Sequence, residues 1–305
     1  GGEDEGPQVE AQEFVTRPDL APPVIDVVNA DAPSEGFLFL GPKQAGAQHG
    51  PLIIDDEGEV VWNLPMEDMA AADFRVQTYQ GEPVLTWYEG TSHDGHGQGE
   101  FVIMDSTYTE IARVTLTDGL DGDLHEFQLT DDGTALVLAY EPREADLTEV
   151  DGPEDGWVLD NHVQEIDIET GEVLFDWRAL GNVPFTDSYR ELVADAATNE
   201  DERDEDGSEE LPMDWFHVNS VEDDGDAFLV SARNTHAVYR ILKESGEIDW
   251  ILNGKSSDFE MCEGTVFAWQ HDARRQDDGT ITILDNAANP PVADRSRGIR
   301  LDVDP

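Results

Sequence analysis

The sequence predicts an all-β protein folded as a β-propeller, in which four-stranded antiparallel blades surround a central channel. Two interleaved repeats carry this prediction. In the first, a histidine is followed at a fixed offset by Asp-Asp-Gly, at HEFQLTDDG (125–133), HVNSVEDDG (217–225) and HDARRQDDG (271–279). In the second, a turn Gly-Glu leads into an apolar run that ends in Trp, at GEVVW (58–62), GEVLFDW (171–177) and GEIDW (246–250). We interpret the first repeat as the opening hairpin of a blade and the second as its closing hairpin.

Short strands separated by turns account for most of the chain. Residues 215–252 contain four apolar strands with Gly, Asp and Asn turns between them, which is the content of one blade. Earlier apolar runs bounded by Gly, Asp or Pro indicate further strands, at GFLFLGP (36–42), GPLIIDDEGEVVW (50–62), EPVLTWYEG (82–90), GEFVIMD (99–105) and EIARVTL (110–116). We expect blades near 36–64, 74–116, 123–180, 214–254 and from 267 onward. The final RSRGIRLDVDP lies within a blade, so an incomplete last blade is an alternative to a complete ring.

Two segments fall outside the expected blades. Residues 1–13 are rich in Gly and acids, which predicts a disordered lead-in and places a single propeller domain at 14–305. Residues 181–213 are expected to form an acidic insertion between blades. Within it, YRELVADAA (189–197) predicts a short helix, and NEDERDEDGSEEL (199–211) predicts a solvated block of charge.

The composition excludes several classes of partner. The 305 residues include 70 Asp and Glu against 17 Lys and Arg, a formal charge of −53, which argues against nucleic acid and anionic membranes. No apolar run approaches the roughly 20 residues that cross a bilayer. Cys262 is the one cysteine, so an intrachain disulfide and a cysteine-rich zinc site are excluded. A carboxylate surface poor in lysine favours a halophilic protein, because salt screens its self-repulsion; an acidic secreted protein is the alternative.

The histidines of the first repeat are the strongest candidates for a site. Because equivalent positions on the innermost strands of a propeller face one channel, we expect His125, His217 and His271 to converge there. Arg233 ends the strand AFLVSAR, which pairs with the strand of His217, and we expect it at the same mouth. Three imidazoles and a guanidinium favour an oxyanion such as sulfate or phosphate over a metal ion. The alternatives are structural histidines and a surface ion pair for Arg233.

Other candidates are weaker. His93 and His96 lie in TSHDGHGQG (91–99), a Gly-rich loop that fits either a metal site or, more often, a solvated turn. His162 stands in a sequence context that supports no site. Cys262 is expected to be an inert small residue beside the channel motif.

A resemblance to a known family extends from about residue 17 to residue 300. The motifs are RPDLAPP, GPLIIDDEGEVVW, DLHEFQLTDDGTAL, DWFHVNSV, SARN, GEIDWILNG, FAWQHDAR and ILDN, in this order. In these motifs the chain resembles the arylsulfotransferase family, in its second, actinobacterial and fungal type branch. The resemblance implies a six-bladed propeller that transfers a sulfuryl group from an aryl sulfate to a phenol, without a nucleotide sulfate donor or another cofactor.

The resemblance also implies roles for individual residues. His271, in QHDAR, matches the nucleophile that becomes transiently sulfated. His217, in DWFHVNS, and Arg233, in SARN, match residues that hold the sulfuryl oxygens, and Asn219 is expected to contact the substrate. His125, in LHEF, matches the remaining channel histidine, with a catalytic and a binding role. From the residues alone, each of the three histidines remains a candidate for the attacking group.

The partners implied are therefore an aryl sulfate and a phenol, and the predicted site contains no metal. Two other functions remain as alternatives: a non-catalytic propeller that binds an anionic ligand or a protein through its channel face, and a metal-dependent propeller hydrolase. An enzyme of this type is expected to be secreted or attached to the cell surface.

Overall fold

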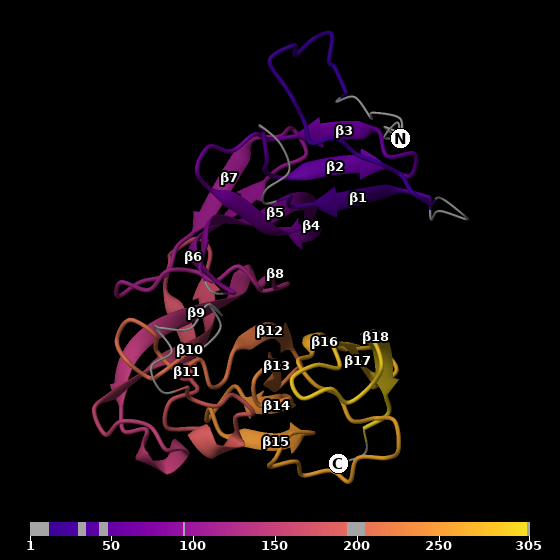
Figure 1. The fold of residues 1–305 in the computed structure, drawn as a ribbon. Helices are drawn as coiled ribbons and strands as arrows, with labels where there is room; N and C mark the ends of the chain where they lie inside the picture. The colour runs from indigo at the N-terminus through magenta and orange to yellow at the C-terminus, as the bar shows by residue number, and fades with distance from the viewer. Residues whose placement is uncertain (1–11, 30–34, 43–47, 94, 194–204, 304–305) are drawn as a thin grey trace, which may run out of the picture.

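The computed structural model describes residues 12–29, 35–42, 48–93, 95–193 and 205–303, and these residues form five antiparallel sheets. Figure 1 shows the sheets following one another along an arc in chain order. The first sheet contains β1 (Phe37–Leu40), β2 (Leu52–Asp55) and β3 (Val60–Asn63). The second contains β4 (Ala70–Tyr79), β5 (Glu82–His93), β6 (His96–Met104) and β7 (Glu110–Val114). The third contains β8 (Phe127–Leu129), β9 (Thr134–Ala145), β10 (Gly156–Asp167) and β11 (Val173–Arg178).

The last two sheets complete the series. The fourth contains β12 (Val218–Asp223), β13 (Ala227–Ala232), β14 (Ala237–Leu242) and β15 (Ile248–Leu252). The fifth contains β16 (His271–Arg275), β17 (Ile281–Asp285) and β18 (Arg297–Leu301). Two short 3₁₀ helices, η1 (Thr148–Val150) and η2 (Phe185–Asp187), lie in connections. Among the described residues no helix is long and apolar enough to cross a membrane.

The β-propeller prediction is confirmed, but the expected number of blades is wrong. The described residues form five blades rather than six, and the first and last have three strands each. The sheets match the five ranges that the sequence repeats mark, apart from the second, which begins at Ala70, four residues before the predicted start. The sixth blade was implied by the family resemblance alone, and no repeat in the sequence corresponds to it.

The insertion at 181–213 also differs from its prediction. In the described part of YRELVADAA, residues 189–193 form no helix, and residues 194–204 lie outside the described chain. Glu205, in the middle of the predicted solvated charge block, is half-buried: its Oε2 accepts a hydrogen bond from the backbone N–H of Asp214 at 2.8 Å. The predicted lead-in falls largely on residues 1–11, which are likewise outside the described part.

Apolar side chains fill the spaces between neighbouring blades. Between the second and third sheets, the rings of Phe101 and Phe127 stack with their centroids 4.7 Å apart. Between the third and fourth, Trp177 packs on Phe216 at 5.8 Å. Phe101, Phe127 and Trp177 lie in strands, where successive side chains point to opposite faces of the sheet. Each of these blades therefore has one face that packs on the next blade. Trp177, which ends the second sequence repeat in this blade, is buried in the core.

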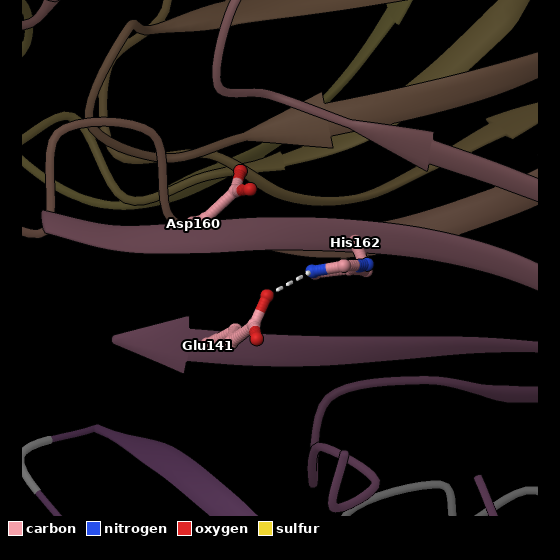
Figure 2. A group of neighbouring side chains, drawn as sticks. All are labelled: Glu141, Asp160 and His162. Atoms are coloured by element: carbon pink, nitrogen blue, oxygen red, sulfur yellow. Dashed lines mark hydrogen bonds and ion pairs between the residues drawn. The ribbon is translucent and has the colours of Figure 1, made fainter. Parts of the chain in front are cut away.

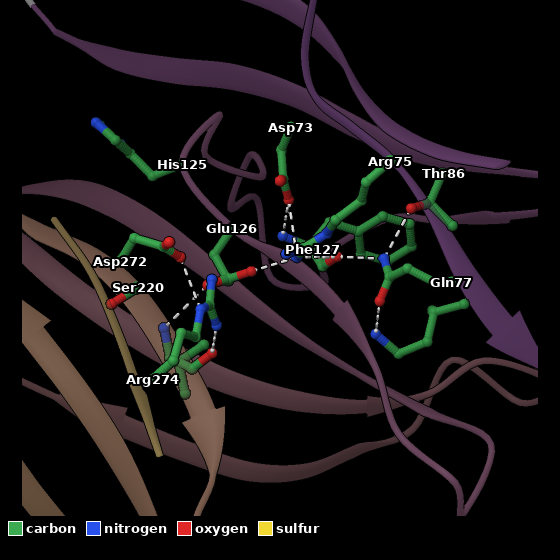
Figure 3. A network of polar contacts seen from close by, with 12 residues as sticks. Asp73, Arg75, Gln77, Thr86, His125, Glu126, Phe127, Ser220, Asp272 and Arg274 are labelled. Atoms are coloured by element: carbon green, nitrogen blue, oxygen red, sulfur yellow. Dashed lines mark hydrogen bonds and ion pairs between the residues drawn. The ribbon is translucent and has the colours of Figure 1, made fainter. Parts of the chain in front are cut away.

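A buried ion-pair network links the inner strands (Figure 3). The carboxylate of Glu126 is fully buried and accepts hydrogen bonds from Arg75 of β4 and, at 2.6 Å, from Nη2 of Arg274 of β16. Its Oε2 also lies 3.4 Å from the backbone N–H of Val221 in β12. Asp73 of β4 lies 3.0 Å from the same Arg75 guanidinium. One carboxylate just before β8 therefore connects the inner strands of four blades.

This network should be essential for stability. Glu126→Gln leaves two largely buried guanidinium groups without their shared carboxylate, and breaking one side of a buried ion pair typically costs about 3–5 kcal/mol. Urea unfolding, which adds no salt, should show a loss of this order. The matched control is Asp278→Asn, which removes the exposed partner of Arg300 and should leave the unfolding free energy nearly unchanged. Equal effects of the two variants would contradict the importance given to the buried network.

Candidate active site

The structure brings the three repeat histidines together. His125 lies two residues before β8, His217 lies directly before β12, and His271 is the first residue of β16. The ring centroid of His125 is 5.2 Å from that of His217 and 6.0 Å from that of His271. They converge because the inner strands of three blades begin at the same end of the propeller axis. The shared offset to Asp-Asp-Gly thus corresponds to a shared position in space.

Two of the rings are held by buried carboxylates. Nδ1 of His125 lies 2.7 Å from Oδ2 of Asp123, and Nδ1 of His217 is hydrogen-bonded to Oδ2 of Asp214. An ionised carboxylate only accepts hydrogen bonds, so each Nδ1 carries the proton and donates it. In a neutral ring this leaves Nε2 with a free lone pair. Nε2 of His217 is buried and has no hydrogen-bond partner among the described residues.

The third ring is held by neutral acceptors. Nδ1 of His271 lies 3.0 Å from the backbone oxygen of Trp269 and 3.0 Å from Oδ1 of Asn286. Because both are acceptors, His271 also carries its proton on Nδ1 and leaves Nε2 unprotonated when neutral. The three histidines therefore share one tautomer. They differ in the group that accepts the hydrogen bond of Nδ1, which is a carboxylate for His125 and His217 and a pair of neutral oxygens for His271.

Burial keeps the rings of His217 and His271 neutral. It lowers the pKa of His217 to about 3, although Asp214 acts in the opposite direction. It also lowers the pKa of His271 to about 4, with further contributions from His125 and Arg233. Burial alone would raise the pKa of Asp214, but the interactions with His217 and Arg233 outweigh it and hold that pKa well below its usual range. At neutral pH the site thus combines an ionised carboxylate with neutral imidazoles that are able to act as bases or nucleophiles.

Arg233 lies at the same mouth as the histidines. It follows β13, and its backbone N–H donates to the carbonyl oxygen of His217 at 2.8 Å. Its guanidinium carbon sits 4.5 Å above the ring of Trp269, and its Nη2 lies 3.6 Å from Oδ2 of Asp214. Asn234 accepts a hydrogen bond from Nε at 3.0 Å. These contacts fix a cation beside His217, where it can face the oxygens of an anion.

Asn219 has a different environment from the one its prediction suggests. Its side chain is buried, and Nδ2 donates to the backbone oxygen of Gln270 at 2.8 Å. It thereby connects β12 to the residue that precedes His271. The structure gives Asn219 a positioning contact, and direct contact with a substrate stays a prediction.

The hairpin between β5 and β6 belongs to the site and was not predicted there. His96 stacks on Tyr140 with ring centroids 5.1 Å apart, and the backbone N–H of Gly97 donates to Oδ1 of Asp123 at 2.7 Å. A Cβ at Gly95 would lie 3.7 Å from Cε1 of His217. His93 and Gly95 are exposed, as expected of a solvated turn, whereas His96 and Gly97 contact residues of the site. The glycines of TSHDGHGQG could have indicated that this hairpin approaches the site, because glycine lets a backbone come close to other groups.

Tyr140 is a second residue that sequence reasoning missed. It is buried, its hydroxyl donates to the backbone oxygen of Val218 at 2.6 Å, and its ring centroid lies 5.6 Å from that of His217. Burial raises the pKa of Tyr140 well above its usual value, so it remains neutral. Tyr140 closes one side of the histidine cluster. No motif in the sequence marks it, since it lies in the middle of an apolar strand.

A cavity of about 590 Å³ opens beside Arg233, within the range typical of small-molecule sites. Its walls combine apolar and charged side chains, among them Pro142, Leu159, Leu211, Asp214, Arg233 and Trp269. His125, His217 and His271 line neither this cavity nor a larger one of about 980 Å³ between the fourth and fifth sheets; the cavity beside Arg233 adjoins them through Asp214, the partner of His217. Cys262, expected beside the channel motif, is exposed and lines this second cavity.

The lowered pKa values can be tested by nitrogen NMR of labelled histidines. At pH 5.5 an ordinary histidine is about 90% protonated, but His217 and His271 should remain neutral with the proton on Nδ1. Because the unfolded chain binds these protons near pH 6.5 and the folded chain does not, acidification below that pH should also reduce the unfolding free energy. The urea-unfolded protein serves as reference. Titration of both rings near pH 6.5 in the folded protein would contradict this account of their burial.

Comparison with known proteins identifies a family and distant structural likenesses. A solved structure of a protein of unknown function from Bacteroides caccae aligns with 87% of this chain and 73% of its own, at 15% identity and a TM-score of 0.44. A likeness at that TM-score carries no argument about function. Curated proteins gave no significant match. Residues 75–305 match the profile of the family described as Arylsulfotransferase (ASST), which is well over half of the sequence. The chain therefore belongs to the arylsulfotransferase family.

Proposed function

We propose that this protein transfers a sulfuryl group from an aryl sulfate to a phenol through a transient sulfohistidine at His271. The observation that carries the proposal is the convergence of three Nδ1-protonated imidazoles beside a fixed guanidinium. Such a site supplies a nitrogen lone pair to attack sulfur, a base to move a proton, and a cation for the sulfuryl oxygens. Membership of the arylsulfotransferase family supports the reaction class.

The groups that accept the Nδ1 hydrogen bonds of the three histidines favour His271 as the nucleophile. A carboxylate stabilises the imidazolium that forms when its partner ring takes up a proton. Asp214 and Asp123 therefore suit His217 and His125 to proton transfer. The Nδ1 of His271 donates to neutral oxygens, which stabilise an imidazolium less than a carboxylate does, so His271 is better suited to attack sulfur through Nε2 than to carry a proton.

The reaction divides into two balanced steps. In the first, Nε2 of neutral His271 attacks the sulfur, the bond between sulfur and the aryl oxygen breaks, and the phenolate leaves and takes a proton from solvent. In the second, neutral His217 accepts the proton of the incoming phenol while the phenol oxygen attacks the sulfur, and the nitrogen–sulfur bond to His271 breaks. His217 then releases the proton to solvent and is neutral again. Arg233 stabilises the charge on the sulfuryl oxygens in both steps.

The cavity beside Arg233 fits this substrate class. Pro142, Leu159 and Leu211 offer apolar surface to an aromatic ring, while Arg233 and Trp269 lie toward the histidines. A metal-dependent hydrolase has less support. Among the described residues, ligand atoms of three histidine, cysteine or carboxylate side chains lie within 4.8 Å of one another only at Glu141, Asp160 and His162, not at the histidine cluster.

The covalent step is tested by single-turnover kinetics with a chromogenic aryl sulfate and no acceptor. Wild type should release a burst of one phenol per site, and His271→Ala should release none. Arg233→Ala should retain a burst that is about 10²- to 10³-fold slower, the usual effect of losing one charge-stabilising donor. His49→Gln, in an isolated bridge with Met66 outside the strands, is the control and should match wild type. A burst in His271→Ala would exclude that residue as nucleophile, and a wild type without a burst for any donor would favour a non-catalytic binding protein.

The proton-transfer role of His217 is tested by Asp214→Asn. The variant keeps the shape of the side chain but removes its charge, so His217 forms its imidazolium less readily. We expect kcat to fall by at least about 10²-fold, the lower range of general acid–base catalysis, with little change in KM. The matched variant Asp123→Asn acts on His125 in the same way. If Asp123→Asn has the larger effect, His125 rather than His217 moves the proton.

A further inference from the structure

A second group of chemically active side chains lies on the third blade, outside the histidine cluster. Glu141 belongs to β9, and Asp160 and His162 belong to β10 (Figure 2). Asp160 pairs with Glu141 across the two strands, and His162 follows Asp160 by two residues, so all three side chains lie on one face of the sheet. One nitrogen or oxygen from each lies within 4.8 Å of the others.

Asp160 provides an independent sign that a ligand is missing. It is 1% exposed, and its Oδ1 accepts the backbone N–H of Leu180 at 2.9 Å. Its Oδ2 is buried and has no hydrogen-bond partner among the described residues. A buried carboxylate oxygen without a partner is costly, and such atoms in native proteins usually mark a bound water or ion.

His162 has the environment of a metal-ligating histidine. The ring is fully buried, and its Nδ1 lies 3.0 Å from Oδ1 of Asp176. A carboxylate that accepts the proton of one ring nitrogen leaves the other nitrogen free to bind a metal, as in carboxylate–histidine–zinc triads. The other nitrogen, Nε2, faces the carboxylate of Glu141 (Figure 2).

The distance between these two groups also fits a shared ion. Nε2 of His162 and Oε2 of Glu141 are 3.3 Å apart. A charge-assisted hydrogen bond is shorter, about 2.7–2.9 Å. Two ligands bound about 2.0–2.1 Å from a tetrahedral ion are roughly 3.3 Å apart. Arg178 also lies near the group, with Nη1 3.6 Å from Oε2 of Glu141 and Nε 3.4 Å from Oδ2 of Asp176. It makes no hydrogen bond to Oδ2 of Asp160, which stays without a partner among the described residues.

We propose that Glu141, Asp160 and His162 bind a divalent transition metal of the Zn²⁺ or Mn²⁺ class. Two carboxylates and one imidazole form a mixed oxygen–nitrogen set that suits these ions better than Ca²⁺ or Mg²⁺, which prefer oxygen ligands. The partial exposure of Glu141 gives the ion a path from solvent. A fourth position remains for water.

The ion would also connect to the active site through the opposite face of the same two strands. Tyr140 precedes Glu141 and packs against His217. Asn161 lies between Asp160 and His162, and its Oδ1 accepts the backbone N–H of Val218, the residue after His217, at 2.7 Å. A metal that joins β9 to β10 would hold both contacts in place. Its role is structural and separate from the sulfuryl-transfer steps.

The test is metal binding by the full chain after treatment with a chelator and dialysis. Zn²⁺ titrated by calorimetry should bind at one site per chain, and Co²⁺ in its place should give visible absorption bands. Asp176→Asn should weaken binding about 10- to 100-fold, the usual effect of losing the partner of a ligating histidine. Asp160→Asn and His162→Gln should weaken it further. The matched control is Glu144→Gln, an exposed acid on the same strand, which should bind like wild type.

His271→Ala separates this site from the histidine cluster and should keep the bound Zn²⁺. Loss of binding in His271→Ala together with retention in His162→Gln would overturn the proposal and place the ion at the active site. Absence of Zn²⁺ binding and of Co²⁺ bands in the wild type would also overturn it. The wild-type Co²⁺ spectrum decides the matter even if Asp160→Asn and His162→Gln fail to fold, which near-ultraviolet circular dichroism would reveal.

Discussion

The buried carboxylate of Glu126 is the constraint on which the active site depends. It is held by Arg75 and Arg274 and reaches the backbone of β12, so it fixes the inner strands of four blades against one another. Each repeat histidine lies within a few residues of a member of this network: His125 precedes Glu126, and His271 precedes Arg274 by three positions. Small shifts between blades would separate the rings, and the network opposes such shifts from the centre of the propeller.

Within the site, the hydrogen bonds of the three histidines determine which ring nitrogen carries the proton. All three histidines donate from Nδ1, and this shared tautomer turns the Nε2 atoms into the reactive groups. The three rings differ in the group that accepts the hydrogen bond of Nδ1. Buried carboxylates behind His125 and His217 favour proton uptake, whereas neutral oxygens behind His271 favour a lone pair that stays available. In the proposed reaction, one residue type thereby serves as both base and nucleophile in a single cluster.

The sequence predicted the parts of this arrangement that repeat. The common offset of the histidines to Asp-Asp-Gly indicated the inner strands, and the blade ranges followed from the turns. It did not reveal Tyr140 or the Gly95 hairpin, because these reach the site through the packing of neighbouring blades. Nor did it reveal Asp123 and Asp214, which lie two and three residues before His125 and His217, because the two offsets differ and form no common repeat. The helix expected at 189–197 is absent from its described part, where Tyr189 instead stacks on His236 at 4.0 Å. Tertiary contacts there override local propensity.

The central claim is that sulfur is carried on Nε2 of His271 between donor and acceptor. The most direct measurement is peptide mass spectrometry of the protein mixed with an aryl sulfate and no phenol, then quenched rapidly at alkaline pH to preserve a nitrogen–sulfur bond. The account predicts a single sulfuryl group on the peptide that contains His271, removed when a phenol is added before the quench. A sulfuryl group on the peptide of His125 or of His217, or one that a phenol does not remove, would contradict it.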